Sequence, residues 1–233
     1  MKNPLLKALR YPLVFVLILL GIHSFGVIYN IRLNHLGVYP REAEGLFGII
    51  SSVFVHGSWE HLFNNSIPLL VLGTALFYFY QSLAPKITLY SILYTGILLW
   101  LGGRPSFHIG ASGLVYALAS FLFFSGFIRK HKSLMALSMC VVFLYGGLVW
   151  GIFPNQERIS WEGHLFGAIN GLFWAMFYRE EGPQRKKYSW ELEEELLQSL
   201  EGLEVIYEEI NGNEPEDEQR SIRYEYKKRK APS

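Results

Sequence analysis

Six long apolar runs occupy the first three quarters of the chain and limit what it can fold into. They lie near residues 11–29, 62–80, 87–101, 112–128, 134–153 and 161–178. Each is close to the ~20 residues that a helix needs to cross a bilayer, although the third is short and the second and sixth carry polar residues. Because lipid offers the backbone no hydrogen-bond partner, a spanning helix is expected for each run. We therefore predict an all-α membrane protein with six transmembrane helices.

The charged residues divide the chain into two parts. Of the 20 acidic residues, 15 lie after Tyr178. We expect a cytoplasmic N-terminus over residues 1–10, a six-span domain over 11–178 and a short charged cytoplasmic tail over 179–233. The first apolar run lacks a small-residue cleavage site and is followed by further spans, so we do not expect a cleaved signal peptide.

The basic residues predict the orientation of the spans. With the N-terminus in the cytoplasm, eleven basic residues fall on that side and four outside, which satisfies the positive-inside rule. The cytoplasmic set is Lys2, Lys7, Arg10, Lys86, Arg129, Lys130, Lys132, Arg179, Arg185, Lys186 and Lys187, and the external set is Arg32, Arg41, Arg104 and Arg158. We expect both termini in the cytoplasm and, from the small size and the lack of an organellar presequence, a bacterial cytoplasmic (inner) membrane.

A few polar residues interrupt the spans near their external ends. The stretch "FHIGASGLVYALASF" places Ser112 at the start of the fourth run, and "HLFNNSIPLL" places His61 and Asn65 one helical turn apart in the second. In the sixth run, "GHLFGAINGLFWA" puts His164 on one stripe with Gly167 and Gly171. Small residues at this spacing let two helices approach closely, as a hydrogen bond between a serine and a histidine on different helices requires.

Each of these residues also has a purely structural interpretation. A serine beside glycine is most often a packing residue, a buried histidine is more often structural than catalytic, and an intramembrane asparagine commonly joins helices. The single cysteine, Cys140, lies mid-span and is expected to act as a small core hydrophobe. Their combination favours a functional site over four separate packing residues. The residues that fall together in the outer halves of three spans are Ser112, His61, Asn65 and His164.

Three motifs together carry a family resemblance. The motifs "GASG" followed by Tyr116, "HGSWEHLFNN" leading into a span, and "GHLFGAING" in the last span resemble those of the rhomboid family of intramembrane serine proteases. The resemblance covers roughly residues 11–178, with the motifs in family order. It implies a six-helix rhomboid-like bundle around a water-filled cavity open to the external side, with a Ser-His dyad.

The resemblance also implies roles for individual residues. Ser112 matches the nucleophile and His164 matches the general base. His61 and Asn65 match the residues that hold the oxyanion together with the backbone N–H of Ser112. Tyr116 matches the aromatic residue on which the catalytic imidazole rests.

Two further residues match the family's motifs, and one stretch of the first external loop differs from the family's pattern. Gly110 belongs to the serine motif, and His56 matches an upstream histidine at the external edge. The first external loop of familiar members carries a Trp-Arg pair, where this chain has Phe47 and Gly48. The departure leaves the catalytic assignment intact and weakens any expectation that this loop anchors in lipid.

The residue inventory permits a dyad but no aspartate-containing triad. The only aspartate is Asp217, far out in the tail. Glu162 precedes His164 by two residues, an offset that points the two side chains in different directions on a helix. The imidazole must therefore be oriented by packing and hydrogen bonds, as Tyr116 could do. The "GASG" motif is not the hydrolase elbow, which needs glycine where Leu114 stands.

Other function classes fit less well. A zinc peptidase needs H-E-x-x-H or H-x-x-E-H, and "HGSWEH" has one residue too many, so we expect neither a metal nor another cofactor. A transporter would need internal repeats, which we do not find. The alternative that stays open is a catalytically silent rhomboid-like protein that binds or escorts membrane proteins, although such proteins usually lack the serine or the histidine.

The expected partners are membrane proteins and the lipid bilayer. By resemblance, a single-span or multi-span substrate enters between the second and fifth spans and unwinds near its external end. In the tail, "SWELEEELLQSLEGLEVIYEEI" predicts an amphipathic helix near residues 190–210 whose apolar stripe packs on a partner or on itself. The charged segment from Asn211 to Ser233 is expected to be flexible, and nothing indicates nucleic-acid binding beyond its short basic end.

Overall fold

A computed structural model describes residues 3–154, 159–185 and 188–211. Our expectations for Lys2, Arg158, Lys186, Lys187 and the charged segment after Asn211 therefore lie outside the described residues. By the contacts within the chain, residues 1–186 form one compact unit and residues 187–233 a second. In the second unit, α8 spans Ser189–Asn211.

Long helices make up most of the first unit, in agreement with the predicted all-α class. They are α1 (Pro4–Ile28), α3 (Trp59–Phe79), α4 (Ala84–Gly102), α5 (Ser112–Arg129), α6 (Lys132–Tyr145) with its continuation η4 (Gly146–Ile152), and α7 (Trp161–Phe177). Short helical turns between α1 and α3 are η1 (Asn34–Leu36), η2 (Ala43–Gly45), α2 (Gly48–Ser51) and η3 (Ser52–Phe54). The described residues form no strand beyond one isolated bridge between Val38 and His108.

Five of these segments are long and apolar enough to cross a membrane. They are α1, α3, α4, α5 and the continuous segment Lys132–Ile152. The predicted sixth span corresponds to α7, which has 17 residues and is shorter than these five. The sixth crossing therefore stays a prediction.

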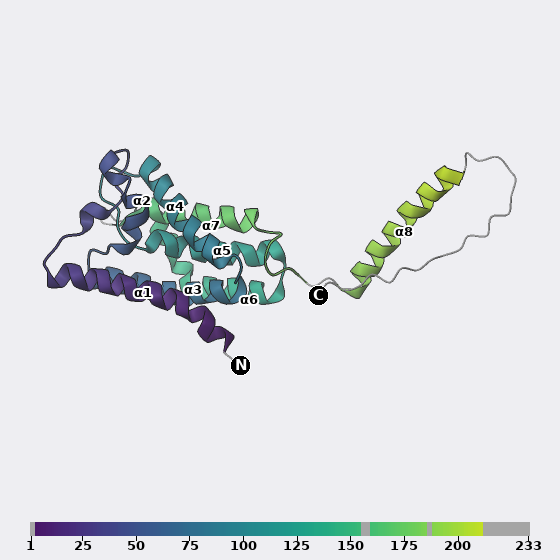
Figure 1. Ribbon diagram of the computed structural model, residues 1–233, viewed down its shortest axis with the longest axis horizontal. Coiled ribbons are helices and arrows are strands. Elements are labelled where there is room, and N and C mark those ends of the chain that lie inside the picture. The colour runs from purple at the N-terminus through teal and green to yellow at the C-terminus, as the bar shows by residue number, and fades with distance from the viewer. Residues whose placement is uncertain (1–2, 155–158, 186–187, 212–233) are drawn as a thin grey trace. The chain divides into compact units, whose positions relative to one another are not determined.

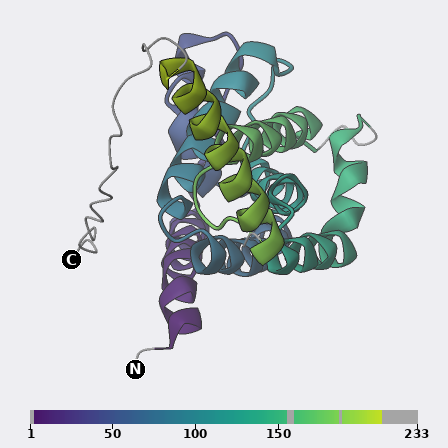
Figure 2. The same cartoon turned by 90° about the vertical axis from the view of Figure 1, so that its right-hand side faces the viewer.

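Helix α5 lies at the centre of the first unit (Figures 1 and 2). It contacts α3, α4, α6 and α7, and most of its residues are buried. Glycines on α7 explain its close contact with α5: a Cβ at Gly167 would overlap the carbonyl oxygen of Gly113, and one at Gly171 would overlap that of Ala117. The glycine stripe of the sequence is thus the packing seam between the helix of Ser112 and the helix of His164.

A buried arginine ties the other ends of α5 and α7 together. Arg129, in the last turn of α5, is 5% exposed and donates to the carbonyl oxygens of Tyr178, Arg179 and Glu181 beyond the end of α7. Its Nε also donates to Ser125 Oγ over 2.8 Å. A cation here satisfies carbonyl groups that a helix C-terminus leaves unpaired.

Candidate active site

Ser112 begins α5 at the end of the bundle where α3, α5 and α7 all start, which we call the site end. The turn before it is held from two directions: Gly110 N–H donates to Ser52 O over 2.9 Å, and Ala111 N–H donates to His56 Nε2 over 3.2 Å. Ser112 is the first residue of α5, so no carbonyl oxygen of an earlier helical turn is available to accept from its backbone N–H. Its N–H is therefore free to bind an anion at the helix N-terminus.

His61 and Asn65 of α3 lie against this turn. Gly110 has a φ of +109°, and a Cβ there would lie 2.6 Å from His61 Nε2 and 3.6 Å from Asn65 Nδ2. Position 110 therefore requires glycine for two reasons: its backbone conformation, and the close approach of the His61 imidazole. The side chain of Asn65 is buried, and its Nδ2 has no hydrogen-bond partner among the described residues. An unused buried donor beside the predicted nucleophile could bind a developing oxyanion.

His164, in the first turn of α7, is held by two contacts. Its ring stacks on Tyr116, with 4.2 Å between ring centroids and 7° between ring planes. Its Nδ1 lies 2.9 Å from the carbonyl oxygen of Gly151 in η4. Because a carbonyl only accepts, Nδ1 carries the proton, and the neutral imidazole then has its lone pair on Nε2. A general base needs this tautomer.

The helices of the two predicted catalytic residues touch directly at the site end. A Cβ at Gly113 would lie 3.3 Å from Gly163 O, one residue before His164. Within the described residues, Ser112 Oγ makes no hydrogen bond to His164. Such bonds are often long in a free enzyme and shorten when substrate binds.

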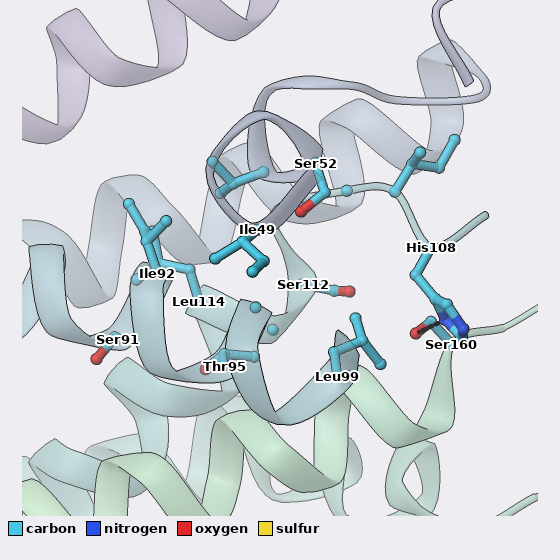
Figure 3. Close-up of a pocket in the computed structure, with 16 residues that line it drawn as sticks. Ile49, Ser52, Ser91, Ile92, Thr95, Leu99, His108, Ser112, Leu114 and Ser160 are labelled. Carbon is cyan, nitrogen blue, oxygen red and sulfur yellow. Dashed lines mark hydrogen bonds between the residues drawn. The ribbon is translucent and has the colours of Figure 1, made fainter. Parts of the chain in front are cut away.

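A cavity opens beside Ser112 (Figure 3). Its lining comes from α2, η3, α4, α5, the start of α7 and the segments just before α5 and α7, and includes Ile49, Ser52, Ile92, Leu99, His108 and Ser160. The mixed lining could admit a small side chain or water to the serine.

His56 supports the turn that carries the serine. Burial, helped by the nearby His61 and His23, lowers the pKa of His56 to about 3. The ring is therefore neutral at pH 7, and its Nε2 must be unprotonated to accept from Ala111 N–H. His23 Nδ1 in turn lies 3.1 Å from the backbone oxygen of His56.

The structure thus places the sequence-predicted residues in two groups. Gly110, His61 and Asn65 meet at the turn before Ser112, and Tyr116 meets His164 across the α5–α7 seam. Sequence analysis missed Gly151, whose carbonyl selects the imidazole tautomer. No spacing rule could have found it, because a backbone carbonyl carries no residue signature and Gly151 lies 13 positions from His164.

Comparison with known proteins identifies the family of the chain. The Rhomboid domain matches residues 43–181. Proteins from Mycobacterium tuberculosis and Mycobacterium bovis, both named only as uncharacterized, are 35% identical over 184 residues, covering 75% of this chain and 75% of each relative. An uncharacterized protein of Mycobacterium leprae is 33% identical over 184 residues, covering 75% of this chain and 72% of its own. The matched range contains both halves of the site described above, and the chain belongs to the rhomboid family.

Proposed function

We propose that the chain is an intramembrane serine endopeptidase that cleaves transmembrane segments of membrane proteins with a Ser112–His164 dyad. The observation that carries the proposal is the hydrogen bond from His164 Nδ1–H to Gly151 O, which leaves Nε2 as the base. The stacked ring of Tyr116 holds that imidazole in place without a carboxylate. Packing and one backbone carbonyl thus do the orienting work that an aspartate does in a triad.

The reaction is acyl transfer. Ser112 Oγ attacks the scissile carbonyl carbon while His164 Nε2 takes the hydroxyl proton. Negative charge then develops on the carbonyl oxygen, where the Ser112 N–H and the side chains of His61 and Asn65 are the donors available to bind it. The imidazolium returns its proton to the leaving amine, and water with His164 as base then hydrolyses the acyl-enzyme.

The bilayer determines which substrates can reach the serine. We infer six spans with both termini in the cytoplasm of a bacterial inner membrane, which puts the site end toward the external face. A substrate helix entering sideways between α3 and α6 must unwind, because a helical carbonyl is already hydrogen-bonded and shielded. Substrates should therefore carry small or helix-breaking residues near the cut.

Cleavage of a single-span reporter by the purified chain in liposomes tests the proposal. Ser112→Ala and His164→Ala should abolish both product formation and covalent labelling by a fluorophosphonate probe. Ser82→Ala and His35→Ala, which change exposed residues of the same types, are the matched controls and should behave as wild type.

Two results would count against the protease. Equal cleavage by all variants would make Ser112 a packing residue. A wild-type chain that neither labels nor cuts any of several reporters would favour the silent binding protein.

A further inference from the structure

A second polar cluster at the site end plays no part in the mechanism above. It joins the loop between α4 and α5 to the start of α7 through Arg104, His108, Ser160 and Glu162. His108 Nδ1 lies 2.7 Å from Ser160 Oγ, and His108 Nε2 lies 3.0 Å from Arg104 O. Figure 3 shows His108 and Ser160 side by side at the edge of the cavity of Ser112.

The direction of these hydrogen bonds follows from their acceptors. Arg104 O can only accept, so His108 Nε2 carries a proton. Burial lowers the pKa of His108, so the ring is neutral at pH 7 and its Nδ1 is an acceptor. The Ser160 hydroxyl therefore donates to His108.

Ser160 departs from the usual behaviour of a serine at its position. It is the N-cap residue of α7, where a serine hydroxyl normally accepts from a backbone N–H of the first turn. Here its side chain makes no capping bond. The hydroxyl is instead committed to His108, 52 residues away in sequence.

The bond connects the two catalytic residues by a path outside the reacting atoms. On one side, the carbonyl of Ser160 accepts from His164 N–H over 3.2 Å. On the other, His108 lies four residues before Ser112, and its backbone pairs with Val38 in both directions at 2.8 and 2.9 Å. The link thus fixes the start of the His164 helix to the segment that leads into Ser112.

An ion pair braces the same junction. Glu162 is 4% exposed, and its Oε1 lies 3.6 Å from Arg104 Nε and 3.4 Å from Arg104 N. Arg104 also donates to Ile159 O over 2.6 Å, so one residue holds the chain on both sides of Ser160. The pair limits how far α7 can move when the link is cut.

We propose that the Ser160–His108 hydrogen bond is a positioning link that sets the distance between Ser112 and His164, an inference that rests on the proposed protease function. Neither residue touches the reacting atoms. Without the link, the first turn of α7 can shift, and a displacement of about 1 Å at a catalytic group costs roughly a hundred-fold in rate. Because the link acts through geometry, it should change kcat and leave KM unaltered.

The test compares removal of the link with its conservation. Ser160→Ala and His108→Ala each remove one partner, whereas Ser160→Thr keeps a hydroxyl and His108→Asn keeps an acceptor near the place of Nδ1. Four quantities are measured in detergent: the rate of fluorophosphonate labelling of Ser112, the kcat and the KM for a single-span reporter, and the thermal unfolding midpoint. Ser82→Ala is the control serine.

We expect Ser160→Ala and His108→Ala to slow both labelling and kcat about ten- to a hundred-fold, with KM unchanged. The double variant should be no slower than the slower single variant, because both remove the same bond. Ser160→Thr and His108→Asn should each regain most of the rate.

Several outcomes would overturn the link. These are wild-type labelling and kcat in both alanine variants, multiplied losses in the double variant, no recovery in either conservative variant, or losses that merely follow a lowered unfolding midpoint. A wild-type chain that labels at Ser112 while these results hold would leave the protease proposal standing. A wild-type chain that neither labels nor cuts would overturn the protease first, and the link's catalytic role with it.

Discussion

The imidazole of His164 lies flat on the ring of Tyr116, with 7° between the two planes, while its Nδ1 bonds to Gly151 O. The hydroxyl of Tyr116 also donates to η4, at Leu148 O over 2.8 Å. One segment, η4, therefore orients both the imidazole of His164 and the ring that supports it. Because α5 carries Tyr116 and α7 carries His164, the contact ties the proposed base to the helix of the proposed nucleophile.

Adding a methyl group at Gly151 should disturb this arrangement. A Cβ there would overlap the Tyr116 hydroxyl and lie 3.1 Å from His164 Nδ1. Gly151→Ala should displace the imidazole or break its bond to the carbonyl, and lower kcat by about a hundred-fold. Reporter cleavage with the purified variant measures the loss.

The same segment supplies a matched control. Gly147 has no atom within 4 Å of an added Cβ, so Gly147→Ala should retain wild-type activity. Equal activity of the two variants would contradict the role given to η4.

Removing an oxyanion donor should slow the reaction without unfolding the protein. Asn65→Ala deletes a buried donor that has no hydrogen-bond partner among the described residues, so little native structure depends on it. Loss of one such donor typically costs roughly a hundred- to thousand-fold in kcat. We expect that loss with an unchanged unfolding midpoint. A full-rate Asn65→Ala variant would exclude the asparagine from the oxyanion site.

Filling the seam between α5 and α7 should destabilise the bundle. A Cβ at Gly171 would overlap Ala117 O and lie 2.8 Å from Ser120 Cβ. Overpacking typically costs roughly 1–3 kcal/mol, and backbone contacts cannot yield by a rotamer change. Gly171→Ala should therefore lower the thermal unfolding midpoint in detergent. Gly21→Ala, which meets nothing within 4 Å, should not, and equal midpoints would show that the seam tolerates bulk.

Much of the fold could be read from the sequence because lipid imposes a simple rule. Long apolar runs must be helical, and the run predicted at 112–128 is the helix Ser112–Arg129. The glycines at four-residue spacing likewise indicated a close helix contact, which is the α5–α7 seam. The predicted ends of the helices were less exact. The first helix begins at Pro4, well before residue 11, because a helix can extend past the apolar run into polar surroundings.

The supporting contacts of the site could not be read in this way. Gly151 acts through a backbone carbonyl, and Ser160 with His108 pairs positions 52 residues apart. Both contacts depend on how loops fold back over the helix ends, and no periodicity encodes that. Ser160 stands at the N-cap position of α7, yet its side chain is bonded to His108 and not to the first turn of the helix.

Stability should fall with acid because of His56. Its pKa is about 3 in the folded protein, against about 6.5 for an unperturbed histidine. Above pH 6.5 the ring is neutral in both states and folding is unaffected. Between pH 6.5 and 3 the unfolded chain binds the proton first, so up to about 1.4 kcal/mol of stability is lost per pH unit. Thermal unfolding in detergent from pH 8 to 4 measures this slope.

A variant separates His56 from the other histidines. His56→Gln keeps an acceptor for Ala111 N–H but does not titrate, so its midpoint should fall less steeply with acid than that of wild type. Identical slopes in the two proteins would place the acid sensitivity elsewhere.

Removing the buried arginine should weaken the fold without slowing the chemistry. Arg129→Met removes the guanidinium that donates to the carbonyl oxygens of Tyr178, Arg179 and Glu181, and hydrogen bonds from a charged group contribute about 1.5–3 kcal/mol each. Arg129 lies 17 residues along α5 from Ser112, roughly 25 Å at the helical rise, so folded molecules should keep their fluorophosphonate labelling rate. Lys86→Met, at an exposed basic residue, is the control and should leave the midpoint in place. A slowed labelling rate at a temperature where Arg129→Met is fully folded would show that the two ends of α5 are coupled, contrary to our expectation.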